Sequence, residues 1–75
     1  MSIRKIILEN LKGYRLKSGL TQEAVAAKAK MGASHYARIE RGEEGLTIER
    51  LEKIAKVLKI EPYLLLISHS FIEAS

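Results

Sequence analysis

The chain has 75 residues and a formal net charge of +4; 47% of its residues are hydrophobic and 29% are charged. Such a length suits one domain with one small core, and the absence of cysteine excludes disulfide bonds and thiolate metal sites. The charge is uneven, because residues 1–42 hold nine Lys or Arg and three Glu, whereas residues 43–75 hold four and six. A basic first half favours a polyanion partner on one side, and an ordinary lysine-rich helical surface stays open as the alternative.

No part of the sequence predicts a secretory or membrane-spanning segment. Ile6-Ile7-Leu8 is too short for the core of a signal peptide, and Glu9 follows it at once. The apolar run from Leu64 to Ile67 is far shorter than the ~20 residues that span a bilayer. We therefore expect a cytoplasmic protein without membrane contact.

The pattern predicts five helices and no strand. The first helix spans about residues 3–17, where Ile7, Leu11 and Tyr14 recur at helical spacing as an apolar stripe. Gly19 is expected to end this helix in the left-handed conformation.

The second and third helices are short and separated by a tight turn. Thr21 is a good N-cap for the second helix, and the third runs from about Ala33 to Arg41, with Gly42 closing it. The side chains expected to pack between them are Val25, Ala26, Ala29, Met31, Tyr36 and Ile39.

Thr47 is expected to cap a fourth helix, and Pro62 is well placed to open a fifth. The apolar face of the fourth helix follows a 3-4 repeat, and Leu65 and Leu66 of the fifth are expected to complete the core. The repeat consists of Ile48, Leu51, Ile54, Ala55 and Leu58.

Residues from about 11 to 66 resemble the DNA-binding domain of phage repressors and Cro proteins, the Xre-type helix-turn-helix family. The resemblance implies an all-α, five-helix, phage-repressor-like DNA-binding domain with a helix-turn-helix, occupying residues 1–75 as a single domain. The matching pieces are Tyr14-Arg15, Gly19-Leu20-Thr21-Gln22-Glu23, Ala26, Arg38-Ile39-Glu40-Arg41-Gly42 and Leu51-Glu52-Lys53-Ile54-Ala55-Lys56-Val57-Leu58.

The resemblance implies a transcriptional regulator that binds double-stranded DNA in a sequence-specific way. No cofactor is expected. An enzyme is a poor alternative, because the chain lacks Asp and Cys and one small helical core leaves no cleft. His35 and His69 lie on different predicted helices without a carboxylate partner, so no metal site is expected.

The third helix is where the family places its base-reading side chains. Arg38 is the strongest candidate, because a guanidinium donates two bonds to guanine; contact with phosphate or a neighbouring Glu is the alternative. His35 beside phosphate would strengthen binding at lower pH, and an inert surface histidine is the alternative. The full base-reading set is Ala33, Ser34, His35, Ala37 and Arg38.

The resemblance also implies contacts with the phosphate backbone and one internal ion pair. Gln22 and Thr21, at the start of the second helix, and Arg41, at the end of the third, are expected to contact phosphates. For Gln22 a solvated polar side chain is the alternative. Arg15 and Glu40 resemble the family's salt bridge between the first and third helices.

Several positions depart from the family pattern, among them Ala33, which replaces a longer polar side chain that relatives often use on bases. Lys30 stands where the family usually has Gly in the turn, and Gly32 stands where it has a capping hydroxyl. The loop Glu43-Glu44 is acidic where many relatives are basic, and it is expected to repel DNA. We therefore expect moderate affinity, steep salt dependence and a need for a dimer.

The segment 61–75 is unusually apolar and is expected to form a dimer interface through Tyr63, Leu64, Ile67 and Phe71. Two copies related by a two-fold axis would set their third helices about 34 Å apart on a palindromic operator. The small core simply covering this segment is the alternative.

Chain size, the loop end Gly45-Leu46-Thr47 and the apolar tail resemble the controller proteins of restriction–modification systems, which are stand-alone dimers that regulate their own promoter and that of the nuclease. An autonomous phage or plasmid repressor is equally compatible. A different class also stays open: an antitoxin-like module whose C-terminal helix binds a partner protein and which regulates its own gene.

Overall fold

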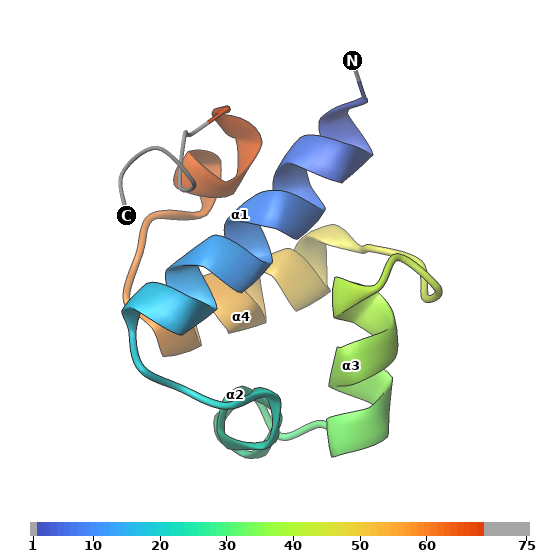
Figure 1. Cartoon of the computed structure of the whole chain (residues 1–75), viewed down its shortest axis with the longest axis vertical. Helices are drawn as coiled ribbons and strands as arrows, with labels where there is room; N and C mark the ends of the chain where they lie inside the picture. Colours follow the sequence, from blue (N-terminus) through green and yellow to red (C-terminus); the bar gives the residue numbers. More distant parts are fainter. Residues whose placement is uncertain (1, 69–75) are drawn as a thin grey trace.

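The computed structural model describes residues 2–68, which fold as helices around one core (Figure 1). The elements are α1 (Ile3–Lys17), α2 (Gln22–Lys28), α3 (Ala33–Glu40), α4 (Ile48–Leu58) and the 3-10 helix η1 (Pro62–Leu66). No strand occurs in this part of the chain, so the all-helical prediction is confirmed there. None of its helices has both the length and the apolar character needed to cross a bilayer.

The prediction of five α-helices is not confirmed, because the fifth element is a single 3-10 segment. Pro62 opens it as expected, and Ile67 ends it in an extended conformation. The Asn10 side chain of α1 donates to the carbonyl oxygens of Leu64, Leu65 and Ile67 at 3.4, 2.8 and 2.7 Å. These carbonyls point at α1 rather than along a helix axis, which explains why the segment does not continue as an α-helix.

Three helices begin at a side-chain cap that the sequence supplies. The hydroxyl oxygens of Ser2, Thr21 and Thr47 accept a hydrogen bond from the backbone N–H three residues later. α3 begins at Gly32, which has no side chain to supply such a bond. Of the four α-helices, α3 therefore has the weakest start.

All four α-helices end in the same way, with a left-handed residue followed by a backbone N–H that bonds five residues back. In α3, for example, Gly42 has φ +80° and the Glu43 N–H donates to the Arg38 carbonyl at 2.8 Å. Gly serves this position twice and Lys twice. The left-handed residues are Gly19, Lys30, Gly42 and Lys59.

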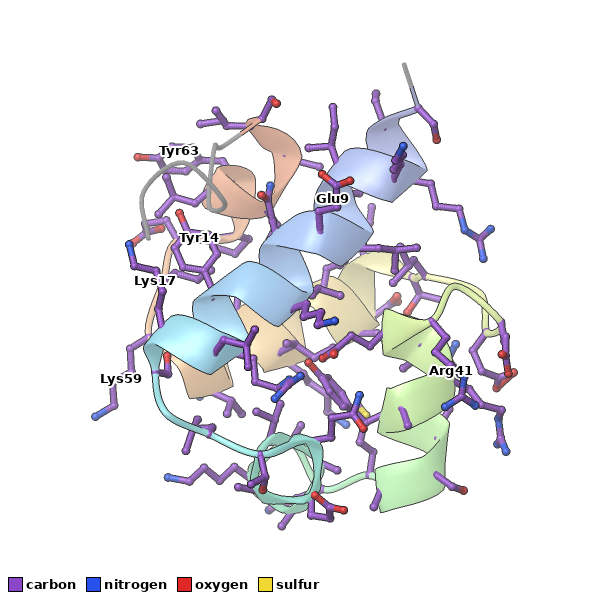
Figure 2. All side chains as sticks on the ribbon, viewed as in Figure 1. Glu9, Tyr14, Lys17, Arg41, Lys59 and Tyr63 are labelled. Carbon is purple, nitrogen blue, oxygen red and sulfur yellow. The ribbon has the colours of Figure 1, made fainter. Side chains whose placement is uncertain are left out.

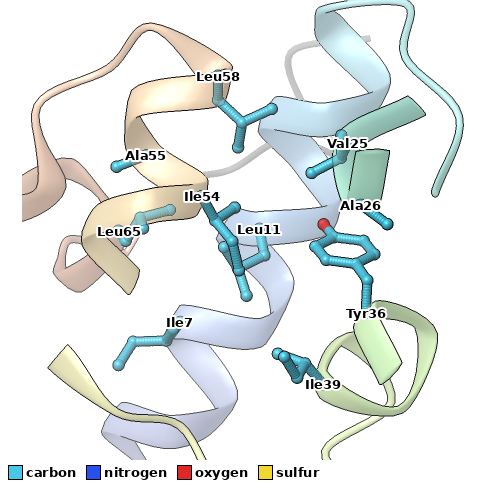
Figure 3. Packing of buried hydrophobic residues seen from close by; sticks show 10 residues of the cluster. All are labelled: Ile7, Leu11, Val25, Ala26, Tyr36, Ile39, Ile54, Ala55, Leu58 and Leu65. Atoms are coloured by element: carbon cyan, nitrogen blue, oxygen red, sulfur yellow. The ribbon is translucent and has the colours of Figure 1, made fainter. Parts of the chain in front are cut away.

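One hydrophobic core joins all the elements (Figure 3). Leu11, Tyr36 and Ile54 are completely buried, and the Tyr36 ring points inward from α3 towards α1 and α2. Two core predictions are wrong. Ile48 is 73% exposed in the first turn of α4, and Leu66 is 52% exposed because neighbouring residues of a 3-10 segment point to different sides, which leaves Leu65 alone to fill the core.

Candidate nucleic-acid interface

Two short helices, α2 and α3, form a rigid corner on one edge of the molecule. Figure 1 shows α2 end-on while α3 runs up the right edge, so the two axes cross steeply. Val25 and Ala26 of α2 are buried against Tyr36 and Ile39 of α3, all at 1% exposure or less. The small side chain of Ala26 allows this close crossing, and the packing fixes which face of α3 points outward.

The corner is fastened to α1 by a salt bridge between Arg15 and Glu40. Arg15 donates from Nε and Nη2 to the two carboxylate oxygens of Glu40, each at 2.9 Å, and from Nη1 to the Leu20 carbonyl at 3.0 Å. The side chains are only 10% and 4% exposed. A bidentate pair of this kind is directional, so it fixes the rotation of α3 about its axis.

The electrostatics of this cluster favour the charged pair. Burial alone would raise the pKa of the Glu40 carboxyl, but the hydrogen bonds from Arg15 and its neighbours outweigh burial, so this pKa lies below its ordinary value. The Tyr36 hydroxyl is buried beside the pair without a hydrogen bond of good geometry. Burial first, and the Glu40 carboxylate second, raise the pKa of Tyr36, which therefore stays neutral.

The outer face of α3 carries the five residues expected to face DNA bases. Ala33, Ser34 and Arg38 are exposed, whereas His35 and Ala37 are half-buried. Ser34 and Arg38 lie four residues apart and therefore on the same side of the helix. This face offers one hydroxyl and one guanidinium, with the methyl groups of Ala33 and Ala37 beside them.

The residues expected to contact phosphate already have partners within the chain. The Thr21 hydroxyl oxygen accepts from the Ala24 N–H at 3.0 Å, as the N-cap of α2. The Gln22 amide donates to a Glu40 oxygen at 3.1 Å, and no local pattern predicts this bond across 18 residues. Arg41 is bonded to Glu43.

The acidic loop after α3 folds back onto that helix. Arg41 donates from Nε and Nη2 to the Glu43 carboxylate at 2.9 and 3.1 Å. The Nε2 atom of His35 is buried without a hydrogen bond, 3.5 Å from a Glu44 carboxylate oxygen. The two carboxylates thus lie beside the His35 imidazole of α3 and the Arg41 guanidinium at the C-cap of that helix.

Asn10 is a residue that the sequence analysis missed. It lies on the buried side of α1 at 1% exposure and bonds the three carbonyls of the C-terminal segment described above. The available signal was its spacing, since Asn10 falls three residues after Ile7 and beside Leu11 within the apolar stripe. A polar residue at such a position needs buried partners.

The expected dimer interface is partly exposed. Tyr63 is 60% and Ile67 45% exposed, Leu64 is half-buried, and Phe71 lies outside the described residues. Figure 2 shows Tyr63 at one edge of the molecule and Arg41 at the opposite edge. An apolar surface and the outer face of α3 therefore occupy different sides of the protein.

The helix-turn-helix family model matches residues 11–65. The chain is similar to "Control protein C.BamHI" of Bacillus amyloliquefaciens, with 32% identity over 62 residues that cover 81% of this chain and 76% of that protein. It is also similar to "Control protein C.SmaI" of Serratia marcescens, with 33% identity over 58 residues that cover 77% and 69%. No solved structure matches the chain.

Proposed function

The chain belongs to the Xre-type helix-turn-helix family of DNA-binding transcription regulators, and we propose that it is a control protein that binds a palindromic operator as a homodimer. Both relatives described above carry the name control protein, and their similarity covers most of each chain. The proposed role is regulation of a restriction–modification system, in which α3 enters the major groove.

The observation that carries this proposal is the outward placement of Ser34 and Arg38 on a helix whose orientation is fixed. Both side chains are exposed, while the opposite side of α3 is held by Tyr36 and Ile39 in the core and by the Glu40 salt bridge. A guanidinium on such a helix can donate two bonds to guanine, and a serine hydroxyl can bond a base edge or a phosphate. We propose that these two residues read the operator, with Ala33, Ala37 and His35 beside them.

The homodimer is supported by the exposed apolar residues of the C-terminal segment. Tyr63 and Ile67 stay largely exposed in a single copy, and a second copy would cover them. The described part measures 30 × 24 × 20 Å. A dimer that reads an inverted repeat must hold its two α3 helices about one DNA turn, or ~34 Å, apart.

Selection of bound fragments from random double-stranded DNA tests the operator. We expect enrichment of an inverted repeat whose half-sites lie about one helical turn, or 10–10.5 base pairs, apart. The enriched site should bind far more tightly than a scrambled duplex of the same composition. Failure to enrich any sequence would contradict a sequence-specific regulator, and a single asymmetric half-site would contradict the symmetric dimer.

Sedimentation of the purified protein tests the interface. Ile67→Glu places a charge on the proposed apolar surface and should convert a dimer into a monomer. Ile48→Glu is the matched control, since Ile48 is also an exposed isoleucine but lies at the start of α4. A native protein that sediments as a monomer, and that binds a partner protein through the same surface, would favour the antitoxin-like alternative.

A further inference from the structure

The end of α3 holds its own acidic loop in a defined place. The N–H groups of Glu43 and Glu44 both donate to the Arg38 carbonyl, at 2.8 and 3.3 Å. Gly42 makes the turn with φ +80°, and the Arg4 guanidinium of α1 donates to its carbonyl at 2.6 Å. A Cβ at Gly42 would lie 3.0 Å from Leu8 Cδ1, so α1 closes the space around the turn. The loop is therefore held by backbone bonds before its side chains make any contact.

This placement gives Arg41 a carboxylate where a phosphate would otherwise bind. A guanidinium offers one planar edge to a bidentate partner, and Glu43 already occupies that edge with two bonds. Both side chains stand at the surface, so the pair can exchange with another anion. The pKa of Glu43 is lowered by its bonds to Arg41, with a smaller contribution from Arg38, which agrees with a carboxylate held close to the cations of α3.

Arg38 differs from Arg41 in this respect. Within residues 2–68 the Arg38 side chain forms no hydrogen bond or ion pair, and it is exposed on the proposed reading face. Glu43 of the acidic loop therefore pairs with Arg41 at the end of α3 and leaves the guanidinium of Arg38, the candidate base-reading residue, available to DNA. Glu44 extends the same arrangement, since its carboxylate covers the Nε2 atom of His35.

We propose that Glu43 is an internal competitor for phosphate: it occupies the Arg41 guanidinium and so weakens contact with the DNA backbone on any sequence, without weakening the base contacts that select the operator. The inference rests on the DNA-binding function proposed above. Sequence-independent affinity comes almost entirely from phosphate contacts by Lys and Arg, whereas discrimination comes from base contacts. A phosphate that binds Arg41 must displace Glu43 and leave a carboxylate close to the DNA backbone. The net gain from Arg41 is then close to zero on any sequence, while the contribution of Arg38 to the operator is kept.

A double-mutant cycle separates this exchange from simple repulsion by a negative charge. The variants are Glu43→Gln, Arg41→Gln and the double variant, with Glu9→Gln as the matched control, because it removes the same charge from an exposed position on α1, away from Arg41 (Figure 2). Fluorescence anisotropy measures binding to a random-sequence duplex and to the enriched site over a range of salt concentrations. Arg41 and Glu43 are both exposed, so their substitution should leave the fold intact. Circular dichroism checks that every variant is folded.

We expect Glu43→Gln to tighten binding to the random duplex, and to do so about two- to five-fold more than Glu9→Gln does. This range corresponds to the strength of one exposed ion pair. Arg41→Gln should change binding less than two-fold in the native background but weaken it about two- to five-fold in the Glu43→Gln background. Because phosphates are alike in every sequence, Glu43→Gln should tighten binding to the enriched site and to the random duplex by about the same factor. The salt slope should steepen by about one phosphate contact when Glu43 is removed.

Two results would overturn the inference. If the effects of the two substitutions simply multiply, Glu43 acts by general repulsion and not through Arg41. If Glu43→Gln behaves like Glu9→Gln, the loop has no influence on DNA binding. Failure of the proposed function looks different, since the native protein would then bind the enriched and random duplexes equally well.

Discussion

Arg15 and Glu40 lie 25 residues apart, yet they form a bidentate salt bridge that joins α1 to the end of α3. The Gln22 amide bonds the same carboxylate, so one side chain of α3 is held from both α1 and α2. Because Ser34 and Arg38 lie on the opposite side of that helix, the pair sets the direction in which they point. The geometry of the proposed interface thus depends on a charge buried behind it.

Glu40→Gln should destabilise the protein by about 3–5 kcal/mol, because it leaves the Arg15 guanidinium buried without its counter-charge. A domain of this size has little more stability than that to lose. Thermal and urea unfolding measure the change. Glu52→Gln, which removes an exposed carboxylate of α4, is the control and should change stability by less than 0.5 kcal/mol.

The same pair predicts how stability depends on pH. The pKa of Glu40 is lower in the folded protein than in the unfolded chain, so the pair stabilises the protein fully above pH 4.5 and loses this contribution as pH falls below that value. Urea unfolding between pH 3 and 7 should show a steep decrease in the native protein at the acid end. The decrease should be shallower in Glu40→Gln; equal slopes would show that other carboxylates control acid unfolding.

Asn10→Leu keeps the approximate size of the side chain but removes the N–H groups that bond the C-terminal segment. The carbonyls of Leu64, Leu65 and Ile67 would lose their donor, and we expect a loss of about 1–3 kcal/mol. If the segment also forms the dimer interface, the dimer should dissociate at higher protein concentration than the native one. Hydrogen exchange of residues 62–67 and sedimentation measure the two effects. Unchanged stability would mean that water replaces the amide.

Lys30→Gly and Lys59→Gly should each stabilise the protein by about 1 kcal/mol, because lysine is strained in the left-handed conformation that both residues adopt, with φ of 57° and 59°. In a domain of this size the melting temperature should rise by roughly 4–8 °C for each kcal/mol. Lys56→Gly has the same chemistry inside α4 and should have the opposite sign, about 0.5–1 kcal/mol less stable. Equal signs at the three positions would contradict an origin in backbone conformation.

The helices and their ends were largely predictable, because the caps and the apolar spacing are local signals. Thr21, Gly19 and Thr47 act where the sequence places them, and Lys30 adopts the left-handed turn expected of the family's glycine. The fifth element was less predictable. Its 3-10 form depends on Asn10, more than 50 residues away, and no local pattern reports such a bond.

The candidate site was predictable in its positions but not in its partners. The resemblance placed Ser34 and Arg38 on the outer face of α3, where both are exposed. The sequence also predicts that Glu43 and Glu44 repel DNA, whereas in the structure their carboxylates lie against Arg41 and His35. That difference arises from the backbone turn at Gly42, which points the loop back along the helix. Side-chain pairing across a turn depends on this geometry and not on residue type alone.

Arg38→Ala tests base reading directly. The variant should bind the enriched site at least tenfold more weakly, in line with the 1–3 kcal/mol expected for one bidentate contact with guanine, and should lose little affinity for a random duplex. Lys28→Ala, which removes an exposed charge from α2, is the matched control. It should weaken binding to the two duplexes by the same small factor. Folding is not at risk, because the Arg38 side chain forms no hydrogen bond or ion pair in the described part of the chain and its backbone bonds are kept in the variant. An equal loss on both duplexes would assign Arg38 to phosphate contact, and discrimination would then have to come from Ser34 and the shape of the operator.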